Sequence, residues 1–433
     1  MQKPAQKLKI WLLLGTAGLF LGCKGEPANL KEPLPSKSGF SFYDTPINYI
    51  NYIRQSSNLN PFAPNSLLDK AALNHAKYVV TNDEITHDES EGRAEFSGKT
   101  PSDRAFAVGF NSGIVENLSY NAHDIKASID GLLSAIYHRF GFLTFDANLL
   151  GVGYYEHGEK SAYVYEMGNE YLEEICGGGK SQSGDGKFII GLCKNKSLAI
   201  RNENYERTRS LNTTPYAHYP NKEPSLAFFS HELPDPVPEC AITANPISIE
   251  FHPQAKPVEM LEFRLFDSEG AEIKDTKILD KKSDPNRRFN DKQFALFSKE
   301  VFKFDATYTA EFSYKQGEKQ DKIRWNFTTQ TPKYDYFIVG GGENLAIKNG
   351  KFYDIFFAPK DCNDEVKNYK TSYNGAIDKP EIQNIATNML RVRVTGERGA
   401  KLEISTDNGK VVSLYLTDEP KNSSLKRKII NLF

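Results

Sequence analysis

The stretch Leu67–Val80, LLDKAALNHAKYVV, decides the fold of the first part of this chain. Its apolar residues recur at intervals of three and four positions, which predicts a helix with a single buried stripe. The residues of this stripe are Leu68, Ala71, Ala72, Ala76, Val79 and Val80. His75 falls inside the stripe, so we expect a core histidine with one satisfied ring nitrogen rather than a ligand.

Periodic segments before and after this helix complete a small domain. Helices are predicted at Ile47–Arg54 and Ile125–Tyr137, and strands at Leu149–Tyr155 and Ala162–Met167. Helices that enclose a small sheet within about 130 residues are typical of an α+β or three-layer domain. We place this domain at residues 41–170.

The length and composition predict further domains and exclude one class of partner. The chain has 433 residues, which is too many for one hydrophobic core and predicts roughly two to four domains. Its formal net charge of -2 gives no electrostatic reason to expect nucleic acid as a partner. The aromatic content of 12% favours β structure over much of the chain.

The sequence periodicity changes after residue 170. Residues 171–240 lack clear periodicity and are predicted to form an irregular extension that ends in a proline-rich boundary. Residues 241–332 alternate apolar and polar positions in short runs, which predicts a β-sandwich domain. Residues 333–433 continue in strands as a C-terminal β domain. Its clearest signal is KLEISTDNGKVVSLYL, a hairpin around Asn408-Gly409 that is typical of a type I′ turn.

The first 23 residues have the pattern of an export signal. Basic residues precede an apolar run that is short for a membrane span. The run ends in Phe20-Leu21-Gly22-Cys23, which resembles the bacterial lipobox, although Phe20 stands where leucine is usual. We expect a lipoprotein signal peptide at 1–23, lipid on Cys23 and a tether at 24–40. The expected location is the bacterial cell envelope, extracytoplasmic and held to the membrane by the lipid. A plain secretory signal is the alternative.

The remaining cysteines fit an oxidising compartment. Cys176 and Cys193 flank a loop rich in Gly, Ser and Lys, so we expect a disulfide there that contributes about 3 kcal/mol by loop entropy. Cys240 and Cys362 are the leftover pair. No C-x-x-C spacing exists, so a zinc site built from cysteines is not expected.

Several stretches look functional but fail on spacing. GGGKS at Gly177–Ser181 lacks the first glycine of a phosphate loop, and His231 lacks the second histidine of a zinc-protease helix. We interpret both as loops. Four further histidines lie in polar surroundings and are expected at the surface: His123, His157, His218 and His252.

Four short motifs after the 67–80 helix occur in an order that is informative. They are His87, Val115-Glu116-Asn117, His138-Arg139 and Gly151-Val152-Gly153. This order resembles the CAP superfamily of cysteine-rich secretory proteins, venom antigens and plant pathogenesis-related proteins. It looks closest to the bacterial branch of extracytoplasmic SCP-like proteins, and SGKTPSDR at 97–104 is similar to the link between their first two motifs. The resemblance covers about residues 45–170.

The resemblance implies an α-β-α sandwich with a central cleft. It carries the two cleft histidines onto His87 and His138 and the acid onto Glu116. Two imidazoles and one carboxylate are suitable ligands for a divalent cation such as zinc. Asn117 and Arg139 would then orient the ligands or attract an anion.

The sequence departs from the family at the second acid. Animal and plant members carry a glutamate on the helix before the second histidine, and Leu132–Tyr137 has none. Asp130 and Ser134 share a helical row with His138 and are the expected substitutes in the cleft. The missing carboxylate weakens a tight metal site and a mechanism with two carboxylates.

Three functions remain open from the sequence. The favoured one is a binding or interaction protein at the envelope, whose partner is a protein, a glycan or a small ligand. The alternative is a metal-dependent, peptidase-like hydrolase with Glu116 as general base. A role in binding lipid or another small apolar ligand ranks last. A purely structural cluster of His87, Glu116 and His138 is the simplest interpretation of the site.

Overall fold

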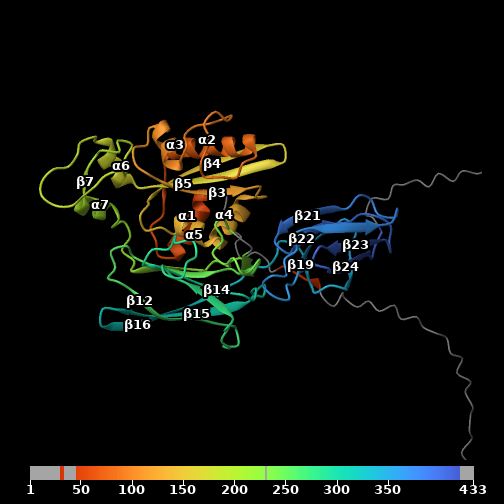
Figure 1. The fold of residues 1–433 in the computed structure, drawn as a ribbon. Coiled ribbons are helices and arrows are strands. Elements are labelled where there is room, and N and C mark those ends of the chain that lie inside the picture. The colour runs from red at the N-terminus through yellow and green to blue at the C-terminus, as the bar shows by residue number, and fades with distance from the viewer. Residues whose placement is uncertain (1–29, 34–44, 230–231, 420–433) are drawn as a thin grey trace, which may run out of the picture.

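The computed structural model describes residues 30–33, 45–229 and 232–419. Figure 1 shows a helical region with its own sheet, a β region beneath it and a second β region to one side. The fold class is α+β, as the sequence predicts. The predicted signal peptide, the predicted lipid site at Cys23 and most of the predicted tether lie outside the described residues. No helix in the described ranges is long and apolar enough to cross a membrane.

The first region is an α-β-α sandwich. Its sheet has the order β2 (Ala63–Pro64), β4 (Leu149–His157), β5 (Lys160–Gly168), β3 (Val115–Tyr120). One face carries α2 (Ser66–Asn82) and α3 (Pro101–Val108), and the other carries α1 (Pro46–Ser56), α4 (Ile125–Ser134) and α5 (Ile136–Phe142) (Figure 1). Alternate residues of β5 face the two layers: Val164 packs with α2, and Tyr165 packs with α1 and α4. Strand β3 is the last strand in the sheet order and is therefore an edge strand.

Helix α2 confirms the opening prediction and lies unusually close to the sheet. Asn65 caps it by accepting from the backbone N–H of Leu68 at 3.1 Å. A Cβ atom at Gly151 would lie 2.1 Å from the carbonyl carbon of Leu68, and one at Gly153 would lie 2.2 Å from that of Ala72. The Gly-x-Gly motif therefore exists because the helix backbone rests directly on β4.

The predicted helix Ile125–Tyr137 is wrong in its continuity. Ala135 has an extended backbone, with φ -82° and ψ 112°, so α4 ends and α5 begins there. Ala135 has no side-chain oxygen for the new helix, and a carboxylate from far along the chain accepts its first N–H groups instead. A contact over that distance leaves no periodic signal in the sequence.

The extension is less irregular than the sequence predicts. It contains α6 (Glu170–Gly177), β6 (Phe188–Ile189), β7 (Ile200–Arg201), α7 (Asn202–Thr208), β8 (Tyr216–Tyr219) and β9 (Phe228–Phe229). The predicted Cys176–Cys193 disulfide is confirmed. Strand β8 pairs with β11 of the next region. The extension therefore supplies an edge strand to the sandwich that follows it.

The middle region is a sandwich of two antiparallel sheets. The first has the order β13 (Thr276–Leu279), β14 (Gln293–Ser298), β11 (Ile247–Phe251), β8. The second has the order β12 (Glu259–Phe266), β15 (Thr307–Gln316), β16 (Lys319–Thr328), and β10 (Thr243–Ala244) pairs with β9. Aromatic residues dominate the core between them, among them Phe251, Phe263, Phe312 and Trp325.

The C-terminal region also contains two sheets. One has the order β1 (Leu30–Lys31), β17 (Tyr336–Val339), β19 (Phe352–Phe357), β22 (Met389–Arg393), β21 (Glu381–Ala386). The other has the order β18 (Asn344–Ile347), β24 (Val411–Leu416), β23 (Lys401–Thr406), β20 (Tyr369–Tyr373). The second disulfide, Cys240–Cys362, joins this region to the start of the middle one.

The predicted hairpin of this region is present, but its turn type differs. Strands β23 and β24 pair around Asn408-Gly409. A type I′ turn needs positive φ at both central residues, and of these two only Gly409 has it, at 84°.

A buried acid between the first two regions predicts a pH dependence of stability. Glu250 on β11 is buried, and its Oε1 accepts from Gln293 at 3.0 Å. Burial raises the pKa of Glu250 to about 8, although the Gln293 hydrogen bond favours ionisation. The unfolded chain releases the proton of Glu250 near pH 4.5, whereas the folded protein holds it until about pH 8. The stability associated with protonated Glu250 is therefore fully present below pH 4.5 and is lost as the pH rises to 8.

We therefore expect Glu250→Gln to stabilise the protein above pH 5 and to flatten its pH profile. At pH 7 the gain should reach about 3 kcal/mol, since each pKa unit corresponds to about 1.4 kcal/mol. Urea unfolding at pH 5, 7 and 8.5 measures it, with exposed Glu259→Gln as control. If the free energy of unfolding of wild type and of Glu250→Gln changed equally with pH, the raised pKa of Glu250 would be contradicted.

Candidate functional site

The site begins with a histidine and an acid at the edge strand. His87 lies in the loop after α2, and Glu116 is the second residue of β3. The Nδ1 atom of His87 is 2.8 Å from Oε1 of Glu116. The His87 side chain is 46% exposed, whereas that of Glu116 is 1% exposed. An accessible imidazole is therefore held from below by a buried carboxylate.

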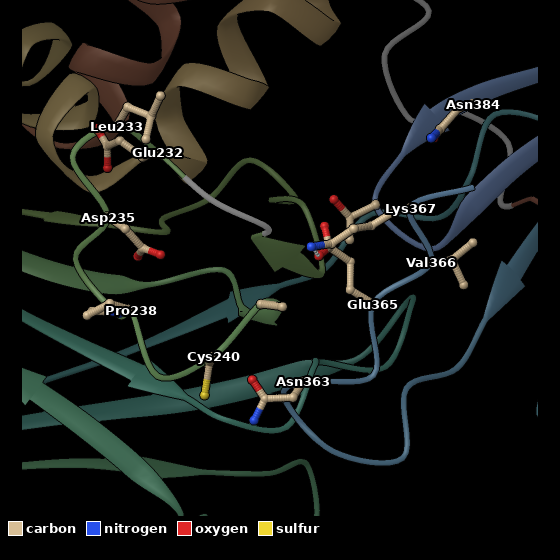
Figure 2. A pocket seen from close by; sticks show the side chains of 12 residues that line it. Glu232, Leu233, Asp235, Pro238, Cys240, Asn363, Glu365, Val366, Lys367 and Asn384 are labelled. Carbon is tan, nitrogen blue, oxygen red and sulfur yellow. Dashed lines mark ion pairs between the residues drawn. The ribbon is translucent and has the colours of Figure 1, made fainter. Parts of the chain in front are cut away.

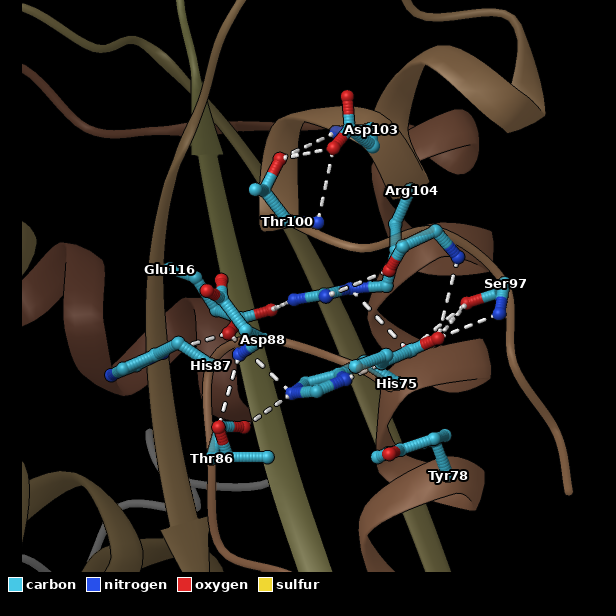
Figure 3. Close-up of polar contacts among 12 residues, drawn as sticks. His75, Tyr78, Thr86, His87, Asp88, Ser97, Thr100, Asp103, Arg104 and Glu116 are labelled. Atoms are coloured by element: carbon cyan, nitrogen blue, oxygen red, sulfur yellow. Dashed lines mark hydrogen bonds and ion pairs between the residues drawn. The ribbon is translucent and has the colours of Figure 1, made fainter. Parts of the chain in front are cut away.

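Glu116 is ionised by its surroundings. Arg104 on α3 donates to its Oε2 at 2.5 Å, and Nε2 of His75 lies 3.6 Å from its Oε1 (Figure 3). Burial opposes ionisation, but His75, the hydrogen bond from His87 and the charge of Arg104 together lower the pKa of Glu116 to about 2. A carboxylate with so low a pKa is a poor proton acceptor near neutral pH.

His75 is a core residue, as its position in the stripe predicts. It is fully buried, and its Nδ1 lies 2.9 Å from Oε1 of Glu89. Its Nε2 lies 2.8 Å from the backbone carbonyl of Thr86, so both ring nitrogens are satisfied rather than one. Glu89 also accepts from the backbone N–H of Ser97 at 2.6 Å. His75, Glu89, Arg104 and Glu116 form one buried polar network that fixes the loop carrying His87. Figure 3 shows His75, Arg104 and Glu116 of this network around His87.

The second histidine has an acid of its own. Nδ1 of His138, on α5, lies 2.6 Å from Oε1 of Glu232. The same carboxylate accepts the backbone N–H groups of Tyr137 and His138, each at 3.1 Å. Glu232 therefore holds the ring and also caps α5, for which Ala135 provides no side-chain acceptor.

Glu232 takes the position that the sequence analysis assigned to Asp130 or Ser134. It lies 94 residues after His138, in the extension. Asp130 instead accepts from Tyr49 at 2.5 Å and from Gln330 at 3.2 Å, and Ser134 donates to the carbonyl of Gly131. Neither contacts a site histidine, because the helix break at Ala135 rotates α5 away from the α4 row. No feature of the single sequence identifies Glu232.

The rings of His87 and His138 lie together, and both use Nδ1 to bind a glutamate. Their ring centroids are 5.8 Å apart, with 29° between the planes. Each Nδ1 bonds a glutamate, and neither Nε2 makes a hydrogen bond within the described part of the chain. Carboxylates on Nδ1 are the usual partners of histidines that bind metal through Nε2.

The donor set offers no more than two histidine ligands at this position. Glu116 is already bound by His87 and Arg104, so it is not an additional ligand. Across the described residues, no group of three or more His, Cys, Asp or Glu side chains is arranged to hold a metal ion. A tight site with Glu116 as third ligand is therefore not supported by this geometry.

Asn117 positions α5, the helix that carries His138, and its side chain lies on the opposite face of β3 from Glu116. Its Nδ2 donates to the backbone carbonyl of His138 at 2.8 Å. Gly141 leaves room for it, because a Cβ atom there would lie 2.9 Å from Oδ1 of Asn117. Two neighbouring residues of β3 therefore hold the two histidines. Glu116 binds the ring of His87, and Asn117 binds the backbone carbonyl of His138.

Arg139 is not a cleft residue. It is fully buried and points into the junction with the middle region. Its guanidinium donates to the carbonyl of Leu133, to the carbonyl of Pro246 and Oγ of Ser248, and to Oδ1 of Asn245. It also lies over the ring of Tyr219, 4.7 Å from the centroid. Arg139 follows His138 on a short helix, and the next residue of a helix points about 100° away.

One further prediction about histidines is wrong. His218 on β8 stacks on Trp325 with the centroids 4.6 Å apart, and burial lowers its pKa to about 4. It is a sandwich residue, whereas His123 and His157 are exposed as predicted. His252 is half-buried against Phe145.

A buried acid that sequence analysis missed lies beside Glu116. Glu166 pairs with Glu116 across β5 and β3, so both side chains share the face covered by α2. Within the described residues, neither carboxylate oxygen of Glu166 has a hydrogen-bond donor. Burial and the charge of Glu116 raise its pKa well above the usual range. The protonated form of Glu166 lies next to ionised Glu116 and adds no second charge.

A cavity of about 650 Å³ lies next to Glu232, between residues 232–241 and 363–387. Figure 2 shows Glu232 and Leu233 on one side and Glu365, Val366 and Lys367 on the other. Leu233 is 84% exposed. The acid that fixes His138 therefore also borders a hollow toward the C-terminal region.

The first region is thus an α-β-α sandwich in which the rings of His87 and His138 lie together, each with a buried glutamate at its Nδ1. The sequence model of the cysteine-rich secretory protein family, CAP, matches residues 47–167. The match covers less than a third of the chain, so residues 47–167 are similar to this family.

Two of the solved structures that this chain resembles are bacterial surface or secreted proteins. An extracellular protein with an SCP domain from Bacillus anthracis has 26% identity over 28% of this chain, with a TM-score of 0.25. This chain spans 38% of that protein's length. An outer surface protein from Borrelia burgdorferi has 19% identity over 29% of this chain and 91% of its own, with a TM-score of 0.26. No curated protein matches the chain.

Proposed function

We propose that this CAP-domain protein is an envelope lipoprotein that binds a partner, with weak divalent-metal binding at His87 and His138. The observation that carries the proposal is the pair of Nδ1–carboxylate contacts, to Glu116 and Glu232. They fix both rings and leave both Nε2 atoms for a metal such as zinc or for a hydrogen-bonding partner. A bound metal would act there as an electrophile.

The hydrolase alternative has less support. It needs Glu116 as general base, yet Arg104 and His87 occupy both of its oxygens and its pKa is about 2. Glu232 accepts two backbone N–H groups in addition to His138, so it is equally committed to structure. A general base needs a free oxygen and a pKa nearer the working pH.

Exposed apolar residues next to the site support a macromolecular or amphiphilic partner. Ile85 is 66% exposed two residues before His87, and Val115 is 48% exposed next to Glu116. Leu233 is 84% exposed next to Glu232. Exposed apolar groups around fixed polar ones are typical of interaction surfaces. The partner class remains an envelope protein, a glycan or a small ligand.

The extracytoplasmic, lipid-anchored location is part of the proposal. Two disulfides support an oxidising compartment. The sequence Phe20-Leu21-Gly22-Cys23 supports lipid modification at Cys23. Membrane contact is then made through the lipid, and nucleic acid is not an expected partner.

Zinc titration of residues 24–433 by calorimetry tests the site. We expect weak binding that falls at least tenfold in His87→Ala/His138→Ala, because both Nε2 ligands are lost. Glu232→Gln should weaken binding about 10- to 100-fold, because Nδ1 of His138 loses its carboxylate. The exposed pair His123→Ala/His157→Ala is the matched control and should bind as wild type.

Equal zinc binding by wild type and the double variant would remove the metal part of the proposal. Turnover of a peptide, ester or glycan that requires both His87 and His138 would replace the binding role with the hydrolase.

A further inference from the structure

Strand β1 belongs to the start of the chain but docks on its last region. Leu30 pairs with Phe337 and Lys31 with Tyr336, in antiparallel register at the edge of the C-terminal sheet. The side chain of Leu30 packs against the core of that region. The charge of Glu32 also acts on Lys351, which lies just before β19. The backbone pairing and the packing of Leu30 therefore hold this short segment beside the C-terminal sheet. Figure 1 shows the C-terminal sheets on which it lies.

The docked strand divides the tether into two parts. Leu30 follows Cys23 by seven residues, and Thr45, which caps α1, follows Lys31 by fourteen. A fully extended chain of seven residues spans at most about 25 Å, and its mean reach when flexible is roughly 15 Å. Without docking, the 22 residues from Cys23 to Thr45 would have a mean reach of roughly 26 Å to the CAP domain.

We propose that the C-terminal β region is the membrane-proximal module of this protein and that its partner there is the lipid surface. This inference rests on lipid modification of Cys23, which is part of the proposed function. The order of domains along the chain predicts the opposite, with the CAP domain nearest the membrane. Docking of β1 reverses that order, because the lipid is tied to β17 by the shorter part of the tether.

The consequence concerns the histidine site. The CAP helices and the C-terminal sheets occupy different sides of the molecule (Figure 1). A lipid held close to the C-terminal region keeps the CAP domain farther from the bilayer. His87 and His138 are then presented to a partner outside the lipid surface rather than to the membrane itself.

Two insertions of equal length test the proposal in the full chain. A ten-residue Gly/Ser segment is placed between Cys23 and Leu30 in one variant and between Pro33 and Thr45 in the other. Each protein carries a donor dye on the exposed Ser372, introduced with a non-canonical amino acid, and is bound to vesicles with acceptor-labelled phosphatidylethanolamine. Energy transfer reports the distance of the C-terminal region from the bilayer.

We expect the first insertion to lower the transfer, because the mean reach before β1 rises about 1.5-fold. The second insertion should leave it unchanged, because it lies beyond the docked strand. Equal transfer in both variants, or a loss only with the second insertion, would show that β1 does not set the distance and would overturn the proposal.

Two forms of the anchor separate this inference from the lipoprotein proposal. Membrane fractionation of the cell-made protein beside Cys23→Ala tests natural lipidation alone, and equal partition of the two would refute it. Attachment of a maleimide lipid to Cys23 of residues 23–433 tests the β1 geometry whatever the cell does. Equal partition in the fractionation experiment refutes the lipid anchor. A distance that does not depend on the first insertion in the maleimide-lipid experiment refutes the orientation.

Discussion

Replacing both Cys240 and Cys362 with serine is expected to lower the free energy of unfolding by about 5 kcal/mol, the largest loss from any cysteine pair here. The disulfide closes a loop of 122 residues, and the entropy of the unfolded chain rises with the length of the loop that is released. It also fastens the C-terminal region to the start of the middle one. Urea unfolding measures the loss and is followed by the fluorescence of Trp325, since the other tryptophan of the sequence is Trp11.

The other disulfide is the matched control. Cys176–Cys193 closes a loop of 17 residues, for which the same arithmetic gives about 3 kcal/mol. A larger loss from this short loop than from the long one would contradict the entropic account. The backbone N–H groups of Ala241 and Ile242 donate to the carbonyl of Cys362, so the serine pair keeps local contact there.

Arg139→Met is expected to cost at least about 3 kcal/mol and to weaken the coupling between the CAP domain and the sandwich. Four acceptors lose their donor, and those that stay buried and unsatisfied cost about 1–3 kcal/mol each. Methionine fills part of the space but donates no hydrogen bond. Calorimetry should show a lower Tm and two separated transitions, since the guanidinium bonds both regions.

Two other substitutions check that result. Arg139→Lys keeps the charge but not the planar fork, so it should fall between wild type and Arg139→Met. Arg398→Met removes an exposed arginine and should change stability by less than about 0.5 kcal/mol. A single unchanged transition in Arg139→Met would contradict the role given to this residue.

The first domain and its resemblance to the CAP family could be predicted from sequence because their signals are local. The 3.6-residue period of Leu67–Val80 gives α2, and glycines at 151 and 153 record its contact with β4. His87, Glu116 and His138 were predicted because the order of the motifs that contain them resembles the CAP family. The same local logic identified the Cys176–Cys193 disulfide.

The tertiary structure alone decided how those residues are used. Glu232 reaches His138 across 94 residues, and β1 reaches β17 across about 300. Arg139 turns from the cleft to the sandwich because neighbouring helical residues point in different directions. Periodicity records which face of an element is buried, but it does not record which distant segment covers that face. The acid of the second histidine and the pairing of β1 with β17 therefore appear only when the chain is folded.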